Sequence, residues 1–118
     1  MTEPETNIRA LMSRAHRTAC DKGWWNFPYR SYGDQWANFH SELSEAWEEI
    51  RKGKSLSYTY HSETEIGSKP EGVAVELADL LIRVFDTCEH YGIPLVEALA
   101  EKMDYNDRRP YRHGGKTA

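Results

Sequence analysis

Residues 70–92, PEGVAVELADLLIRVFDTCEHYG, form the most apolar segment of the chain and decide its fold. Their apolar residues recur at spacings of three and four, which is the period of one face of an α-helix. Pro70 suits the first turn of such a helix, and Tyr91-Gly92 is typical of its end. The sequence therefore predicts a central helix over 70–91. Its apolar face carries Val73, Leu77, Leu80, Leu81, Val84, Phe85 and Cys88.

Three further segments have residues typical of the start or the end of a helix. Residues 31–53 begin at Ser31 or Asp34, either of which can cap a helix, and they carry an apolar stripe up to Gly53. Prolines suit the start of a helix over 1–23 and of a fourth helix over 94–106. We therefore expect a single all-α domain over 1–118, built as a small bundle. The stripe on 31–53 consists of Trp36, Phe39, Leu43, Trp47 and Ile50.

Two segments lack this helical period. Residues 54–69 contain serine, threonine, glycine and lysine, and they predict a long loop with room for a short strand. Residues 107–118 predict a basic, glycine-rich tail without helix. Long loops in compact domains are often functional, so residues 54–69 are a candidate functional segment.

The composition of the chain excludes several classes of protein. The 118 residues carry 15 basic and 19 acidic side chains, so a uniformly cationic binder of nucleic acid polymers is not expected. No apolar run has the roughly 18 residues of a membrane span, and the acidic N-terminus predicts no signal peptide. Cys20 and Cys88 lie among apolar neighbours, so we expect both to be buried and reduced in a cytoplasmic protein. His16 and Cys20 share a helical face, but two ligands do not make a zinc site.

The carboxylates provide the main chemical signal. Glu42, Glu45 and Glu49 share one helical face beside the apolar stripe of 31–53, and Glu76 and Asp79 repeat the i, i+3 spacing on 70–91. If the two helices pack on their apolar stripes, the acidic pairs converge. Convergent carboxylates either take up protons or hold a cation, and all-oxygen ligands favour Mg²⁺ or Mn²⁺. Asp86 lies on the same side of its helix, with Arg83 between. The alternative is an ordinary solvated acidic face.

The basic residues gather at the opposite end of the sequence. Residues 102–118 contain five basic and two acidic side chains, which gives +3 and leaves −7 for residues 1–101. Lys102, Arg109 and Arg112 could therefore bind the phosphates of an anionic substrate that also carries a metal ion. The alternative is a basic tail that only aids solubility.

Two tryptophans stand outside the helical stripes. Trp24 and Trp25 follow Gly23 in a connector without helical period, where indole rings can stack on a nucleobase. The alternative is a hydrophobic cover over a small domain or a subunit interface.

These residues together resemble the MazG-like family of all-α nucleoside triphosphate pyrophosphohydrolases. Glu42-x-x-Glu45 followed by Glu76-x-x-Asp79 is similar to the paired acidic signature of that family, and 102–110 is similar to its segment after the last core helix. The ending at 109–116 and the run Lys22-Gly23-Trp24-Trp25 resemble short members from bacteriophages and prophages. The resemblance covers most of the chain and is weakest over 54–69.

The resemblance implies a fold, an activity and a site. The fold is a four-to-five-helix antiparallel bundle that is complete only as a homodimer or homotetramer. The activity is Mg²⁺-dependent hydrolysis of a nucleoside triphosphate to the monophosphate and pyrophosphate, with Mn²⁺ as a substitute. Carried over by position, the metal ligands are Glu42, Glu45, Glu76 and Asp79, and the phosphate-binding residues are Lys102, Asn106 and Arg109, beside Arg112.

One departure from the family pattern leaves a ligand open. Many members have two adjacent acids at the start of the first motif, whereas Ser41 precedes Glu42 here, and Glu49 or Asp86 could supply the extra carboxylate. Glu45 is our candidate for the base that takes a proton from the attacking water. Competing hypotheses are a non-catalytic helical dimerisation module and a regulator that binds a nucleotide without cleaving it. The sequence does not select a nucleobase.

Overall fold

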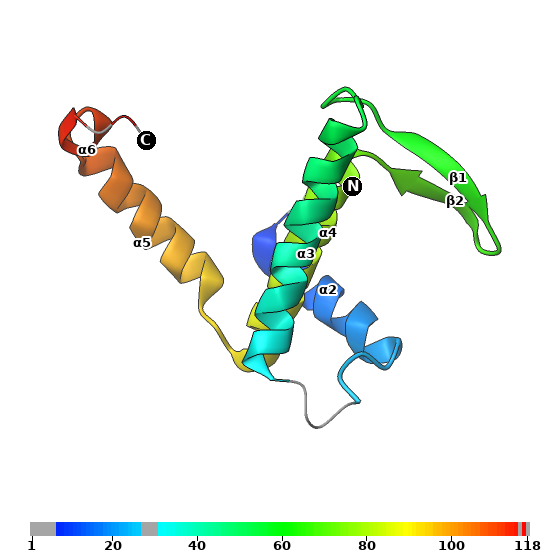
Figure 1. Cartoon of the computed structure of the whole chain (residues 1–118). Coiled ribbons are helices and arrows are strands. Elements are labelled where there is room, and N and C mark those ends of the chain that lie inside the picture. The colour runs from blue at the N-terminus through cyan, green and yellow to red at the C-terminus, as the bar shows by residue number, and fades with distance from the viewer. Residues whose placement is uncertain (1–6, 27–30, 116, 118) are drawn as a thin grey trace.

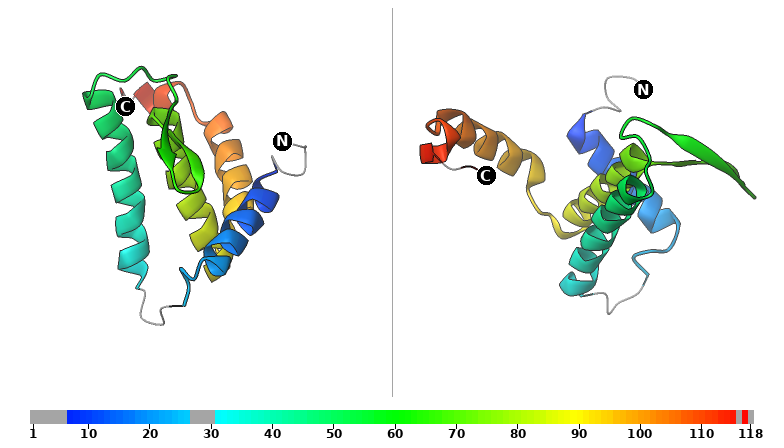
Figure 2. Two further views of the ribbon diagram at one scale, coloured as in Figure 1. Left: turned by 90° about the vertical axis from the view of Figure 1, so that its right-hand side faces the viewer. Right: turned by 45° about the horizontal axis from the view of Figure 1, so that its top comes forward.

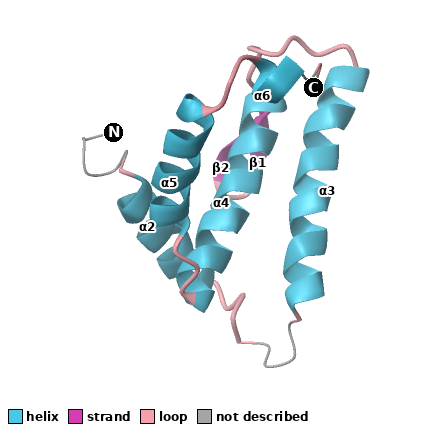
Figure 3. Cartoon of the chain, turned by 90° about the vertical axis from the view of Figure 1, so that its left-hand side faces the viewer, coloured by secondary structure: helices cyan, strands magenta, loops and turns pink. Residues whose placement is uncertain are grey.

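The helices pack around one central helix. In the computed structural model, which describes residues 7–26, 31–115 and 117, helix α4 lies between α2 and α3 (Figure 3). The chain rises along α3 and returns along α4, so these two helices are antiparallel (Figure 1). The elements are α2 (Ile8–Asp21), α3 (Tyr32–Arg51), β1 (Tyr60–Thr64), β2 (Gly67–Glu71), α4 (Val73–Tyr91), α5 (Leu95–Arg108) and α6 (Arg112–Gly115).

Local signals in the sequence set the ends of these helices. Ser31 caps α3 in a capping box, because its hydroxyl accepts from the Asp34 backbone N–H while the Asp34 carboxylate accepts from the Ser31 N–H, both at 3.1 Å. Asn7 caps α2, where its side chain accepts from the Arg9 N–H. Gly92 ends α4 in the left-handed conformation, with φ of 68°, which glycine adopts without steric cost.

The fourth long helix leaves the other three. Helix α5 and the β-hairpin extend from opposite sides of the group formed by α2, α3 and α4 (Figures 1 and 2). No residue of α5 is buried. The radius of gyration is 17.0 Å, compared with about 13.5 Å for a compact chain of this length. A single chain therefore packs three helices, and the expected four-to-five-helix bundle is not closed within it.

The faces on which α3 and α4 pack differ from the prediction. Residues of α3 that are buried lie on its polar side. In the apolar stripe expected to form the core, Phe39 is half-buried, and the other four residues are exposed by between 36% at Ile50 and 58% at Trp47. On the apolar face expected for α4, Val73 and Cys88 are buried, whereas Leu77 and Leu81 are 42% and 52% exposed. The prediction placed these two helices against each other through their apolar stripes. Cys20 of α2, which was also expected to be buried, is exposed. The buried residues of α3 are Gln35, Glu42, Ala46 and Glu49.

The segment predicted as a long loop contains a β-hairpin. Strands β1 and β2 pair antiparallel from Tyr60 opposite Glu71 to Thr64 opposite Gly67, and a two-residue turn joins them. Pro70 therefore lies in β2 and not in the first turn of a helix, and α4 begins at Val73 rather than at 70. The strands are exposed along most of their length, so they lack the alternation of apolar and polar residues that identifies a half-buried strand. The class is mostly helical, as predicted, with a small two-stranded sheet in addition.

The predicted boundaries shift by a few residues elsewhere. The second helix, expected over 31–53, spans Tyr32–Arg51, and the fourth, expected over 94–106, spans Leu95–Arg108. The tail predicted over 107–118 contains the end of α5 and the short helix α6, because Pro110 interrupts the helix only locally. Pro4, expected to open the first helix, lies outside the described residues. In the described part of the chain, no helix combines the length and the hydropathy needed to cross a membrane.

Candidate functional site

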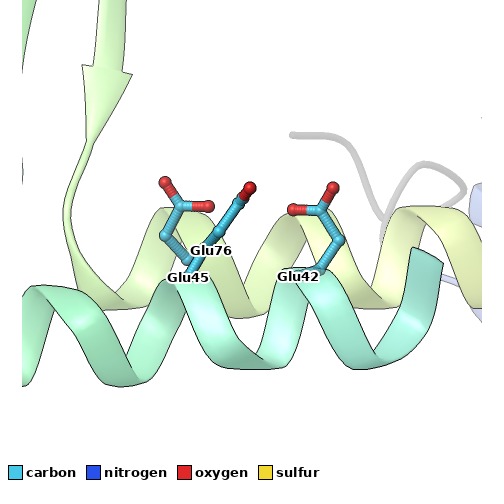
Figure 4. Close-up of side chains that lie close together, drawn as sticks. All are labelled: Glu42, Glu45 and Glu76. Atoms are coloured by element: carbon cyan, nitrogen blue, oxygen red, sulfur yellow. The ribbon is translucent and has the colours of Figure 1, made fainter. Parts of the chain in front are cut away.

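Three glutamates meet between α3 and α4. Glu42 and Glu45 of α3 and Glu76 of α4 point to the same side of the helix pair (Figure 4). One carboxylate oxygen of each lies within 4.8 Å of one carboxylate oxygen of the others. The antiparallel packing of α3 on α4 places the Glu42–Glu45 pair of α3 beside Glu76 of α4. The predicted convergence of acidic side chains therefore occurs, although α3 packs through its polar face and not through its apolar stripe.

Mutual repulsion and burial perturb these acids. The pKa of Glu76 is raised to about 7, first by burial, then by its hydrogen bond with Glu45 and by the charges of Asp79, Glu45 and Glu42. The pKa of Asp79 is also raised, chiefly by burial and then by Glu42, while Arg83 and Lys69 act in the opposite direction. Carboxylates in this state gain from a bound cation, because it removes the repulsion that otherwise favours protonation.

Glu42 has a cation of the chain as its partner. Its side chain is only 10% exposed, and its Oε1 accepts a hydrogen bond from Nε of Arg83 at 2.6 Å. Arg83 lies one helical turn after Asp79 on α4, which allows its guanidinium to reach across to α3. The charge of a buried carboxylate is thus balanced in the absence of a ligand.

Glu49 extends the acidic face by one more turn of α3. Its Oε1 accepts a hydrogen bond from the Tyr60 hydroxyl at 2.8 Å, and this bond with Glu49 is the main reason that the pKa of Tyr60 is raised to about 12. Glu49 is 6% exposed, and its Oε2 is buried without a hydrogen-bond partner among the described residues. An orphaned buried carboxylate oxygen is costly unless a donor or a cation satisfies it.

The donor set fits a hard divalent cation. Carboxylate oxygens converge from two helices, and within 7–26, 31–115 and 117 no nitrogen or sulfur ligand joins the group. Glu49 presents a spare oxygen on the same face of α3. Oxygen-only ligands of this kind favour Mg²⁺ or Mn²⁺ over zinc. Asp79 is not part of the group of three, but its perturbed pKa places it in the electrostatic field of Glu42.

A cavity of about 760 Å³ opens beside this cluster. Its volume is within the range of small-molecule binding sites. Of the three glutamates, Glu42 lines this cavity. Its wall also contains Lys22, Trp24, Asp79 and Asp86. One of the two tryptophans predicted to stack on a base therefore lines the same cavity as two predicted metal ligands.

Trp25 and Asp86 have other contacts. The Trp25 ring stacks on His90, with centroids 3.6 Å apart and planes 7° apart, and its indole N–H donates to Asp86 Oδ1 at 2.8 Å. The same Asp86 oxygen lies 2.9 Å from Nδ1 of His16. Of the two residues expected as an extra acid, Glu49 lies on the acidic face of α3. Asp86 lines the cavity with Glu42 and Asp79 and also contacts His16 and Trp25.

The predicted phosphate-binding residues lie on the segment that leaves the bundle. Lys102 and Arg109 both face the Tyr105 ring, with their charged groups 4.9 Å and 5.6 Å from its centroid. Arg112 lies in the same way against Tyr111, at 5.5 Å. Lys102 and Asn106 belong to α5, which diverges from α3 toward its C-terminal end (Figure 1). A single chain therefore does not bring its basic segment onto its acidic cluster.

Two residues of the site are not predicted by the sequence. The sequence pattern indicates only that Arg83 lies between Asp79 and Asp86. The i, i+4 spacing from Asp79 to Arg83 places these two side chains on one helical face, which is the signal that could have found the arginine. Tyr60 lies in the segment predicted as a loop, and no sequence signal connects it to Glu49. No family model, curated protein or solved structure matches this chain.

Proposed function

We propose that the chain is a metal-dependent nucleoside triphosphate pyrophosphohydrolase. The observation that carries the proposal is the convergence of Glu42, Glu45 and Glu76 beside a cavity large enough for a nucleotide. Glu49 adds a buried carboxylate oxygen without a partner among the described residues. The resemblance of both acidic pairs to the MazG-like signature gives the reaction, which yields a nucleoside monophosphate and pyrophosphate.

Residues of this chain have distinct roles in the proposed reaction. Glu42, Glu45, Glu76 and Asp79 hold the cation, and Glu49 is the extra acid. Bound Mg²⁺ would neutralise the triphosphate charge and lower the pKa of a water molecule. Glu45, which is exposed, accepts the proton of the water that attacks the α-phosphorus. Trp24 stacks on the base from the cavity wall.

A second copy of the chain completes the site in this proposal. The exposed apolar stripe of α3 and the unburied α5 leave a large apolar area for a partner helix to cover. Assembly as a homodimer or homotetramer would then bring an α5 segment onto the carboxylates. From there, Lys102, Asn106, Arg109 and Arg112 bind the phosphates and stabilise the leaving pyrophosphate.

The test is product analysis with a panel of ribonucleoside and deoxyribonucleoside triphosphates in the presence of Mg²⁺ or Mn²⁺. We expect pyrophosphate and not orthophosphate. Glu45→Gln and Asp79→Asn should each lower turnover at least about 100-fold, because each removes a charge from the cation site. Glu48→Gln is the matched control, since Glu48 lies on the same helix but forms an ion pair with the exposed Arg51 at 3.0 Å.

The alternative function is a non-catalytic dimerisation or nucleotide-binding module. The exposed apolar stripe and the cavity are compatible with it. Release of no pyrophosphate from any triphosphate with either metal would contradict the enzymatic proposal. Retained nucleotide binding under those conditions, measured by calorimetry, would favour the regulatory module.

A further inference from the structure

One wall of the cavity beside the acidic cluster comes from α2. Arg14, Thr18 and Lys22 follow one another at intervals of four residues, so they continue one face of this helix, and all three line the cavity. The walls from α3 and α4 include the carboxylates of Glu42 and Asp79. Because α2 and α3 lie on either side of α4 (Figure 3), cations line the cavity from α2 and carboxylates line it from the other two helices.

The two cations of α2 have no carboxylate partner in the described part of the chain. Residues 8–22 contain four lysine or arginine side chains and one acidic side chain. Arg9 pairs with Glu97, but neither Arg14 nor Lys22 forms an ion pair within 7–26, 31–115 and 117. Lys22 follows the last turn of α2, where the helix dipole favours a cation, whereas Arg14 lies in the middle of the helix. No acidic residue stands three or four positions from Arg14, so its charge is available to a ligand.

A ligand of this cavity must match charges of both signs. A simple anion would meet the carboxylates of Glu42 and Asp79, and a simple cation would meet Arg14 and Lys22. A polyphosphate that carries a divalent cation matches both, because the metal ion binds carboxylates while arginine and lysine bind phosphate oxygens. Arg83 also lines the cavity, but it already pairs with Glu42 and so does not replace the cations of α2.

We propose that Arg14, Thr18 and Lys22 bind the phosphates of a metal-bound polyphosphate in this cavity. The guanidinium of Arg14 can donate two parallel hydrogen bonds to one phosphate, and the Lys22 ammonium acts as a compact charge. The two residues lie about 12 Å apart along the helix axis, and their long side chains can converge on phosphates between them. The Thr18 hydroxyl donates from the intervening turn.

The proposal rests on the proposed function for the identity of the ligand, a nucleoside triphosphate, and it adds a phosphate-binding face on the same chain as the carboxylates. The apolar side chains of Leu11, Ile82 and Phe85 complete the lining and suit the sugar and base. One chain therefore binds the triphosphate without a second copy, and the α5 residues of a partner add contacts to the leaving pyrophosphate.

The experiment measures the binding of inorganic tripolyphosphate to the full chain by titration calorimetry, with Mg²⁺ present. Arg14→Gln and Lys22→Gln should each weaken binding about tenfold, because each removes a charge-assisted contact to phosphate. Thr18→Val should weaken it about threefold, since only a neutral hydroxyl is lost. Arg17→Gln is the matched control: it removes the same charge from the same helix, but Arg17 does not line the cavity, and less than a twofold change is expected.

Two outcomes would overturn the proposal. One is a wild type that does not bind tripolyphosphate in the presence of Mg²⁺. The other is an equal affinity of Arg14→Gln and Arg17→Gln, with the helical circular dichroism of both unchanged. Arg14 is exposed, so its substitution is expected to leave the fold intact.

Failure of the proposed function would give a different result. In that case no triphosphate releases pyrophosphate, while tripolyphosphate still binds and its affinity still depends on Arg14. If only the phosphate-binding face of α2 is wrong, pyrophosphate is released, and Arg14→Gln has the same KM as Arg17→Gln.

Discussion

Arg83 and Glu42 form an ion pair across the two helices of the candidate metal site, with Nε and Oε1 2.6 Å apart. The pair matters because Glu42 is nearly buried and belongs to the group of three convergent glutamates. Without a metal, Arg83 is the cation that balances its charge. With a metal bound, both Arg83 and the metal ion neutralise the Glu42 carboxylate. The stability of the fold and the affinity for metal are therefore linked through this arginine.

Removal of Arg83 should destabilise the metal-free chain. Arg83→Gln leaves the Glu42 carboxylate buried with a weaker partner, and we expect the free energy of unfolding to fall by about 2 kcal/mol. Urea unfolding with a chelator measures this loss. Saturating Mg²⁺ should restore more stability to the variant than it adds to the wild type.

Arg51→Gln is the control, because Arg51 and Glu48 form an exposed pair worth at most about 1 kcal/mol. An equal Mg²⁺ effect in variant and wild type would contradict the prediction.

The metal-free fold should lose stability as the pH rises through the range from about 4.5 to 7. Glu76 has an ordinary pKa of 4.5 in the unfolded chain and about 7 in the folded one, so the folded state binds more protons in this range. Its contribution is complete below pH 4.5 and is lost as the pH approaches 7. Thermal unfolding with a chelator at several pH values tests this, and Glu76→Gln should flatten the decline. A wild-type stability that rises across the whole range, with the variant parallel to it, would show that Glu76 is not perturbed.

A charge on the exposed stripe of α3 should prevent self-association. Leu43 is 52% exposed in the single chain, so Leu43→Glu leaves the packing of α3 on α4 intact. We expect sedimentation to show an oligomer for the wild type and at least about 100-fold weaker association for the variant, since a buried unpaired charge costs several kcal/mol at an interface. Ile66→Ser is the control, because Ile66 is 99% exposed at the hairpin tip, away from the helices. A monomeric wild type would refute the proposed assembly.

Gly72 should tolerate no side chain. It joins β2 to α4 with φ of 128°, and a Cβ there would meet the Tyr58 carbonyl oxygen at 2.5 Å. Gly72→Ala should cost about 3 kcal/mol of unfolding free energy. Gly53→Ala is the matched control: Gly53 also has positive φ, at 82°, but nothing lies within 4 Å of the position that its Cβ would take, so about 1 kcal/mol is expected. Chemical denaturation measures both, and equal costs would mean that the contact with Tyr58 is relieved.

The acidic site could be predicted because its spacing is local. Two acids at i, i+3 share a helical face whatever the partner helix is, and antiparallel neighbours with a common polar side bring such faces together. The side on which the helices pack could not be predicted. Periodicity locates the apolar stripe of Leu43 and Trp47, but it does not say whether the same chain or another covers it.

The contacts of the hairpin and of Asp86 could not be predicted for a different reason. Tyr60 reaches Glu49 only because an exposed ribbon, with no alternating pattern to reveal it, folds back beside α3. The helical face of Asp86 is compatible with a metal site, and the sequence alone therefore groups it with those acids. Its actual partners, His16 and Trp25, are 70 and 61 residues away in sequence, and no local rule connects them.

The hairpin has one more consequence, which concerns unwanted assembly. A two-stranded ribbon has two free edges, and such edges can recruit strands from other chains. Pro70 places a residue without an N–H in β2, and Glu63 and Lys69 add charges to the two strands. A continuous ladder along the β2 edge is therefore blocked. The molecule can therefore carry an exposed ribbon with a reduced risk of fibril formation. The assembly proposed above would then form through the helices and not through the ribbon.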